Sequence, residues 1–232
     1  MELAGILIVH LTVLMASQHS HQVNPSAAKQ TPQLTPLAEL QLVEAHRRGD
    51  PDAIGKLLEA YQRRLYGICY RMVRNEHDAR DLTQDSLVRV IQGLDSYDGR
   101  SKLSTWIIRV TMNTCLSHLR KQRLRRHGSL DSASEHASEG PVDPRSMREL
   151  LPSGRVELSE MRSVLGRAML CLDPEMRAVL VLRDMQDLEY QSIAHSLEIP
   201  IGTVKSRLFR ARLALRAAVE AELGQAKVKA ND

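Results

Sequence analysis

Two stretches of the sequence concentrate basic side chains without any acidic neighbour, and each could bind a polyanion. Residues 203–216 include five Lys or Arg and no Asp or Glu, and residues 100–126 include eight and none. Surface helices normally mix both signs of charge, so these stretches favour contact with phosphate groups over simple solvation. The net charge is only +4. The distribution of charge, rather than its total, therefore predicts nucleic-acid binding.

The more C-terminal of the two basic stretches belongs to the pattern of a helix-turn-helix. A short helix is expected over 187–197, and the Pro and Gly of 198–202 break it. Thr203 is expected to cap the helix that follows. One apolar stripe of that second helix consists of Val204, Leu208, Ala211 and Leu215. A basic helix with a single buried stripe, placed after such a turn, is typical of DNA-binding domains. A helical hairpin whose charges are merely solvated is the alternative.

The remaining elements predict an all-α protein of two small helical domains joined by a flexible linker. Aromatic residues make up only 3% of the chain, and the apolar residues recur at helical spacing throughout. Asp50 is expected to cap a helix that starts at Pro51 and ends at Val73, and Asp78 to cap the next helix. The further helices are expected over 103–126, 156–170 and 176–185.

We predict the following division of the chain. An N-terminal extension covers 1–36, a first helical domain 37–127, a linker rich in Ser, Asp, Glu and Pro 128–155, a second helical domain 156–224 and a polar tail 225–232. The extension begins with an apolar run over 1–16 that is too short to span a bilayer. It is interpreted as a disordered tail, a membrane-touching segment or the product of a start site placed too early, and we favour the last.

Catalytic and metal chemistry find little support in the sequence. The three cysteines, Cys69, Cys115 and Cys171, are far apart, form no CxxC pair and have no histidine at ligand spacing. They predict buried free thiols in a reducing cytoplasm. No nucleophile–base pair and no Gly-rich phosphate loop is recognisable. The sequence therefore predicts a cytoplasmic protein that is not an enzyme and needs no cofactor.

Two sets of motifs resemble the extracytoplasmic-function sigma factors. Residues 77–85 (HDARDLTQD), the DGRS of 98–101, the Thr105–Trp106 pair and Asn113 are similar to region 2 of that family. Residues 172–180 (LDPEMRAVL) and 199–212 (IPIGTVKSRLFRAR) are similar to its region 4. The resemblance covers residues 37–223, in the family's order and with a short linker in place of a region 3 domain. Members of the family direct RNA polymerase to promoters.

The resemblance implies three sets of site residues. Those expected to dock on the clamp helices of core RNA polymerase are Asp81, Gln84 and Asp85. Those expected to contact the minus-ten element are Tyr97, Arg100, Lys102, Trp106, Arg109, Asn113, Arg120 and Lys121. Tyr97 and Trp106 are the candidate platforms for unstacked bases. Those expected to contact the minus-thirty-five element are Thr203, Lys205, Ser206, Arg207, Phe209 and Arg210.

Each of these assignments has a plainer alternative. The acids near the start of a helix could be there because its dipole favours them. Trp106 could simply belong to the core, and Phe209 could pack over the core rather than contact DNA. The sequence departs from the family pattern at Leu103, where an aromatic residue is usual, and at Ser117, where Asp is frequent. These departures weaken a prediction of the promoter sequence, but not of the class.

The sequence thus predicts a sigma factor whose partners are core RNA polymerase and promoter DNA. The resemblance adds an anti-sigma factor, and membrane contact is expected only through such a factor if it is itself membrane-bound. A small-molecule substrate is not expected. Two alternatives remain: a stand-alone helix-turn-helix regulator that binds duplex DNA without polymerase, and an adaptor that binds other proteins only.

Overall fold

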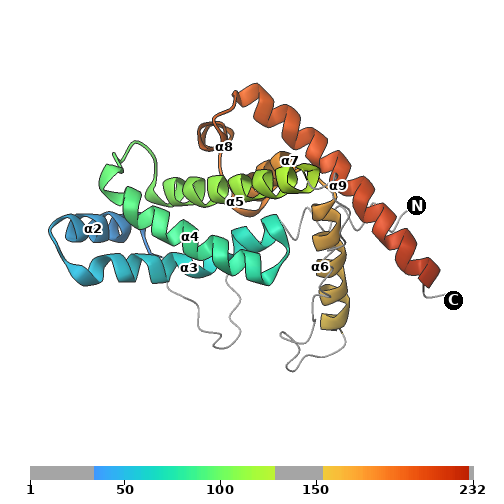
Figure 1. The fold of residues 1–232 in the computed structure, drawn as a ribbon, viewed down its shortest axis with the longest axis horizontal. Coiled ribbons are helices and arrows are strands. Elements are labelled where there is room, and N and C mark those ends of the chain that lie inside the picture. The colour runs from blue at the N-terminus through green and yellow to red at the C-terminus, as the bar shows by residue number, and fades with distance from the viewer. Residues whose placement is uncertain (1–33, 129–153, 230–232) are drawn as a thin grey trace.

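The computed structural model describes residues 34–128 and 154–229, and all regular structure in these two segments is helical. The predicted extension over 1–36, the linker over 128–155 and the end of the tail lie largely outside the described residues. Figure 1 shows that α5 runs through the middle of the molecule, between α2–α4 on one side and α7–α9 on the other. The structure thus confirms the all-α fold with two groups of helices.

The first group consists of α2 (Pro36–Arg47), α3 (Pro51–Val73), α4 (Glu76–Gly93), the short 3-10 helix η1 (Leu94–Ser96) and α5 (Leu103–Gly128). Local signals set their starts. Asp50 accepts a hydrogen bond from the amide of Asp52, and Pro51 occupies the first position of α3, as predicted. The side chain of Asn75 accepts from the amide of Asp78 and caps α4. The prediction that Asp78 is the cap was therefore wrong, because an Asn three residues earlier takes that place.

The second group consists of α6 (Gly154–Leu170), α7 (Pro174–Leu180), the π-helical turn η4 (Val181–Met185), α8 (Tyr190–Leu197) and α9 (Ile201–Lys229). Glu198 ends α8 in the left-handed conformation with φ 56°. The chain then turns into α9, which gives the expected helix-turn-helix. Helix α9 already begins at Ile201, so Thr203 lies in its first turn and not at the predicted cap position. Pro200 supplies the carbonyl that accepts from the amide of Thr203 at 2.9 Å.

The buried apolar side chains of both groups form one connected core. It includes Leu65, Ile68 and Met72 from α3 and Leu182 and Val204 from the second group, all 0% exposed. Of the three predicted buried thiols, Cys69 and Cys115 are buried, but Cys171 is exposed in the turn between α6 and α7. The prediction for Cys171 was wrong because α6 ends before this residue, which therefore does not lie on an apolar helix face.

Candidate nucleic-acid interface

The outer face of α4 presents carboxylates and apolar side chains to solvent. Asp81, Gln84 and Asp85 are all exposed. Val88 and Ile91, which are 50% and 40% exposed, continue the stripe that Asp81 and Gln84 begin, at spacings of seven and ten residues from Asp81. An exposed helix face that mixes charged and apolar groups suits a protein partner. Val88 and Ile91 were not among the predicted site residues, because the same residue types form the core stripe of α4.

An open groove of about 410 Å³ lies between α4 and α5. Its lining comprises Arg89, Gln92, Gly93, Trp106, Val110, Asn113, Thr114 and Ser117. The indole of Trp106 packs so closely on Gly93 that a Cβ atom there would lie 3.1 Å from the ring. A residue with a Cβ atom at this position would therefore require the indole to shift by a few tenths of an ångström. The predicted Trp106 and Asn113 are brought together in one hollow, with Arg89 and Gln92 from α4 as further polar groups.

Tyr97, the second predicted platform, lies in the core rather than on the surface. It is 6% exposed, its hydroxyl donates to the carbonyl of Ser101 at 2.5 Å, and its ring lies 5.6 Å from that of Trp106. Burial raises the pKa of this phenol. Arg47 donates to the carbonyl of Tyr97 at 2.6 Å. In this arrangement Tyr97 holds the turn that leads into α5 and supports Trp106, and its ring faces are not open to a base.

The basic residues of α5 and of the turn before it fall into two groups. Lys102 and Lys121 are exposed, and Arg100 pairs locally with Asp98 at 3.1 Å. Arg109 and Arg120 instead reach the other group of helices. Arg109 contacts Glu198 at 2.8 Å and the Nε2 of His195 at 3.0 Å. Arg120 contacts Glu175 at 3.6 Å. Two predicted DNA contacts therefore have acidic partners across the molecule.

The first turns of α9 carry the predicted base-reading residues. Lys205, Ser206 and Arg210 are exposed, and Phe209 is 66% exposed. Ser206 donates to the carbonyl of Thr203 at 3.1 Å. Thr203 itself is half-buried. These side chains share one helix face and its flanks, within reach of a groove of duplex DNA. Phe209 does not close the core, which removes that alternative.

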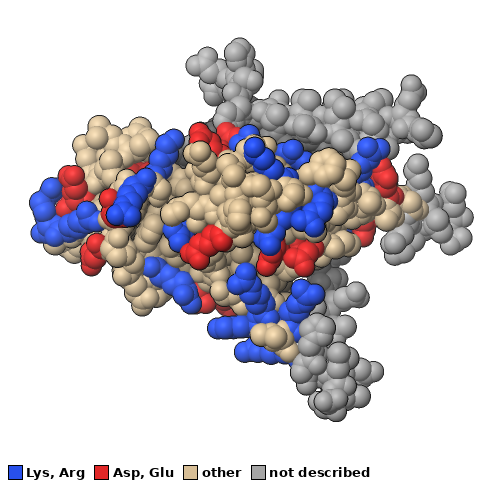
Figure 2. Space-filling model, turned by 90° about the horizontal axis from the view of Figure 1, so that it is seen from above, with Lys and Arg blue, Asp and Glu red and all other residues tan. Residues whose placement is uncertain are grey.

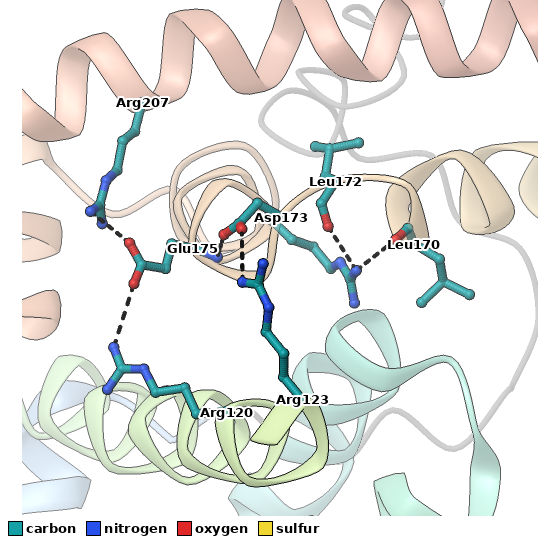
Figure 3. A network of polar contacts seen from close by, with 8 residues as sticks. Arg120, Arg123, Leu170, Leu172, Asp173, Glu175 and Arg207 are labelled. Atoms are coloured by element: carbon teal, nitrogen blue, oxygen red, sulfur yellow. Dashed lines mark hydrogen bonds and ion pairs between the residues drawn. The ribbon is translucent and has the colours of Figure 1, made fainter. Parts of the chain in front are cut away.

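Arg207 on α9 pairs with a carboxylate of α7. Its side chain is 24% exposed, and its guanidinium lies 2.6 Å from Glu175. Figure 3 shows Glu175 between Arg207 and Arg120, with Asp173 beside it facing Arg123 at 3.7 Å. We call Asp173 and Glu175 the α7 acid pair. Asp173 also caps α7 by accepting from the amide of Glu175. Sequence reasoning missed these contacts, since only the tertiary packing brings α5, α7 and α9 together.

Arg177 joins the two groups of helices from a buried position. It is 4% exposed, and its guanidinium donates to the carbonyls of Met169, Leu170 and Leu172 at 2.8, 3.0 and 3.0 Å. It also donates to the carbonyl of Met72 at the end of α3. Burial lowers the pKa of Arg177, but the four carbonyls compensate much of the lost hydration. Arg177 thus ties the α6–α7 turn to the first group.

Acidic and basic side chains are interspersed over much of the face seen in Figure 2. Acids of the second group of helices pair with several arginines of the acid-free stretches, which partly offsets their positive charge. In the described segments no group of three or more His, Cys, Asp or Glu side chains could hold a metal ion. Within the same segments no helix is long and apolar enough to cross a membrane.

Comparison with known proteins agrees with this architecture. The family model for sigma-70 region 2 matches residues 57–125, and the model for sigma-70 region 4 matches residues 162–215. The chain is 32% identical to the ECF RNA polymerase sigma factor SigW of Bacillus subtilis over 174 residues, which are 73% of this chain and 90% of SigW. It is also 32% identical to the RNA polymerase sigma-H factor of Pseudomonas aeruginosa over 194 residues, 83% of this chain and 100% of that protein.

Two solved structures share the fold. The sigma factor RpoE from Bartonella quintana, solved with the anti-sigma factor NepR, has a TM-score of 0.55 and 22% sequence identity, over 73% of this chain and 98% of RpoE. CnrH, solved with the cytosolic domain of CnrY, has a TM-score of 0.52 and 22% identity, over 80% of this chain and 97% of CnrH. These likenesses place the two helix groups in the same fold as those proteins.

Proposed function

The chain belongs to the extracytoplasmic-function (ECF) sigma factors, and on that premise we propose how its two domains divide the work. As a member of this family it directs core RNA polymerase to specific promoters and initiates transcription by recognising and melting them. The first domain, 37–127, docks on core polymerase and binds the minus-ten element. The second domain, 156–224, binds the minus-thirty-five element, and residues 128–155 link the two.

The observation that carries this proposal is the combination of a docking stripe and a base-sized groove on adjoining faces of α4. The stripe consists of Asp81, Gln84 and Asp85 with the apolar Val88 and Ile91. A stand-alone DNA-binding protein has no need of such a surface. Carboxylates on this face suit basic groups on the clamp helices of the polymerase, because complementary charges guide encounter and fix the register of docking.

The groove between α4 and α5 suits one unstacked base of the melted strand. Trp106 offers part of an aromatic face, and Asn113 and Gln92 can donate to and accept from a base edge. Basic side chains around it contact the phosphates. We assign this role to Arg100, Lys102, Arg109, Arg120 and Lys121, and we assign to Tyr97 the support of Trp106.

In the second domain the first turns of α9 enter the major groove. Arg207 and Arg210 can each bind a guanine through two hydrogen bonds, and each such contact contributes roughly 1–3 kcal/mol of discrimination. Lys205, Ser206 and Thr203 contact phosphates or base edges, and the exposed Phe209 contacts a thymine methyl or a sugar.

We further propose that the chain itself catalyses no reaction and uses no cofactor, because the chemistry of transcription belongs to the polymerase. The chain then works in the cytoplasm, where core polymerase and promoter DNA are its partners. An anti-sigma factor is a third partner. The two relatives of the same fold were solved with an anti-sigma factor and with a cytosolic protein domain, respectively, which supports a protein partner of this kind here.

Run-off transcription tests the proposal. Purified core polymerase is supplied with a genomic fragment library, with and without this protein. Protein-dependent start sites are expected, and their sequences reveal the promoter. These start sites should vanish with Asp81→Arg plus Gln84→Ala and weaken or shift with Arg207→Ala plus Arg210→Ala. Tight binding to specific duplex DNA without polymerase, together with no new start sites, would favour the stand-alone regulator instead.

A further inference from the structure

Two buried thiols touch at the contact between α3 and α5. The sulfur atoms of Cys69 and Cys115 lie 3.7 Å apart, and both side chains are 0% exposed. The residues are 46 positions apart in the sequence, so only the packing of the first domain brings them together. Neither cysteine takes part in docking or in DNA binding. The pair is thus a cluster of nucleophilic groups without a role in the proposed function.

The two sulfurs are not equivalent. The thiol of Cys115 donates to the sulfur of Cys69, which lowers the pKa of Cys69 against the opposing effect of burial. The same contact and burial raise the pKa of Cys115. Thr83 and Ser86 also lie beside Cys69, but their hydroxyls donate to the carbonyls of Ala79 and Leu82, both at 2.6 Å. Cys69 is therefore the sulfur that ionises more readily, and a thiolate is the nucleophile in thiol oxidation.

We propose that Cys69 and Cys115 form an oxidation site, at which hydrogen peroxide produces a disulfide bond between α3 and α5. The thiolate of Cys69 attacks one oxygen of the peroxide, the O–O bond breaks, and hydroxide leaves and is protonated to water. Cys69 is then a sulfenic acid. The sulfur of Cys115 loses its proton and attacks that sulfur, and a second hydroxide leaves as water. In sum, two thiols and one peroxide give one disulfide and two waters.

Geometry allows this step with a small movement. A disulfide bond is about 2.05 Å long, so the sulfurs must approach by roughly 1.7 Å from their present 3.7 Å. The bond would fix α5 to α3 only two residues beyond Asn113, which lines the α4–α5 groove. Oxidation therefore changes the support of the groove and closes a covalent loop within the first domain.

Burial sets the rate of the reaction. Peroxide reaches the pair only when the helices open briefly, whereas Cys171 is exposed and its sulfur contacts the carbonyl of Arg167. Cys171 is an internal reference, because it meets the same oxidant but has no neighbouring thiol in the described structure. We expect its thiol to disappear several-fold faster than those of the pair.

The test uses the full chain alone, so it does not depend on the proposed function. A Cys171→Ser chain is exposed to hydrogen peroxide, denatured, alkylated before and after reduction, and digested for mass spectrometry. We expect Cys69 and Cys115 to be lost together, to be restored by dithiothreitol, and to appear as one cross-linked peptide pair. The oxidised chain should unfold at higher urea concentration than the reduced chain.

A Cys115→Ala variant is the matched control. In it Cys69 should stop at sulfenic acid, which dimedone traps, and no cross-linked pair should form. The proposal is overturned if both thiols remain alkylatable after exposure that oxidises Cys171 completely in the unaltered chain. It is also overturned if Cys69 proceeds to sulfinic acid without a cross-link. If Cys115→Ala does not fold, the presence or absence of the cross-linked peptide pair in the Cys171→Ser chain still tests the proposal.

Discussion

The proposed docking face on α4 and the proposed DNA-binding residues on α5 and α9 are in different states in the same structure. Asp81 is 63% exposed, and its contact with the Nδ1 of His77 at 3.1 Å lies within its own helix. Arg109, Arg120 and Arg207 instead pair with carboxylates of the second domain. The proposed polymerase face is thus open to a partner, while several of the proposed DNA-binding arginines already pair with carboxylates. The difference suggests an order of events in which polymerase binds first and DNA second.

The ion pairs alone do not account for this closed arrangement. The side chains of Arg120 and Arg123 are 67% and 68% exposed, and pairs so exposed contribute about 0–1 kcal/mol each. Arg177 is buried and supplies donors to four carbonyls from both domains. The shared apolar core also holds the domains together. If these arginines bind DNA as proposed, the ion pairs compete with DNA for them, whereas Arg177 and the core set how the domains sit.

The largest effect is expected at the docking face. Replacing Asp81 by Arg and Gln84 by Ala places a cation opposite a basic partner surface, and like charges in such a contact cost several kcal/mol. We expect affinity for core polymerase to fall by about 3 kcal/mol, roughly a hundredfold. Titration of fluorescently labelled protein with core polymerase measures it.

Glu59→Arg plus Gln62→Ala is the matched control for the docking face. These two residues are exposed on α3 with the same spacing and undergo the same change of charge. Affinity for core polymerase should be nearly unchanged in this variant. If both double variants lose the same affinity, α4 is not a specific docking face and the contrast drawn between the two surfaces disappears.

A smaller effect is expected from Arg177→Met, which removes the buried link between the domains. The carbonyls of Met72, Met169, Leu170 and Leu172 lose their donor. Because unsatisfied buried polar groups each carry a desolvation penalty, we expect the free energy of unfolding to fall by about 2–3 kcal/mol. Urea unfolding followed by circular dichroism measures this change. Arg162→Met, at an exposed position of α6, should stay within roughly 0.5 kcal/mol of the unaltered protein. Equal losses in the two variants would remove Arg177 from its linking role.

The third prediction concerns Arg210, a proposed recognition residue for which the described structure shows no ion pair. Arg210 is exposed on α9, where its Nε lies 3.4 Å from the carbonyl of Ser206. Arg210→Ala should weaken the binding of the polymerase–sigma complex to its promoter by roughly 1–2 kcal/mol, about five- to thirtyfold. Promoter competition assays at fixed salt measure the loss. Arg216→Ala, six residues further along the same helix, should cost much less. A larger loss at Arg216 would move the recognition surface toward the end of α9.

The sequence was sufficient for the all-α fold, because this fold rests on local patterns. Apolar periodicity, the Asp50–Pro51 start and the turn before α9 are all encoded within a few residues. The partners of Arg207 and Arg120 were not predictable in the same way. Glu175 lies in the first turn of α7, where an acid is common because the helix dipole favours it. Its role depends on how α5, α7 and α9 pack, which no single stretch encodes.

The exposure of Tyr97 also depends on tertiary packing that the sequence pattern did not predict. An aromatic residue beside a basic turn predicts a stacking platform, yet Tyr97 is 6% exposed, whereas Trp106 nine residues later lines the groove. The difference arises from which side chain packs under the turn. Arg89 and Gln92 were not predicted as site residues, because they line the groove only as a result of the packing of α4 on α5. Composition and spacing predict which residues could bind DNA, but tertiary contacts determine which of them are accessible.

The smallest effect is expected from Glu175→Gln, which tests the competition directly. The change removes one charge from the α7 acid pair and frees Arg207 and Arg120, but it alters a half-exposed pair worth about 1 kcal/mol or less. We expect the free protein to bind promoter duplex roughly two- to fivefold more tightly, with its unfolding free energy changed by less than about 1 kcal/mol. Fluorescence anisotropy with labelled duplex measures the binding.

Glu189→Gln separates this competition from the general effect of charge. Glu189 is an exposed acid that precedes α8 in the same domain, so the substitution removes an equal charge without freeing Arg207. If Glu175 competes with DNA for the arginines, only Glu175→Gln should raise DNA affinity beyond the change expected from one lost charge. An equal gain in both variants would mean that the arginines exchange freely between carboxylate and phosphate. The paired state would then impose no order on the binding of polymerase and DNA.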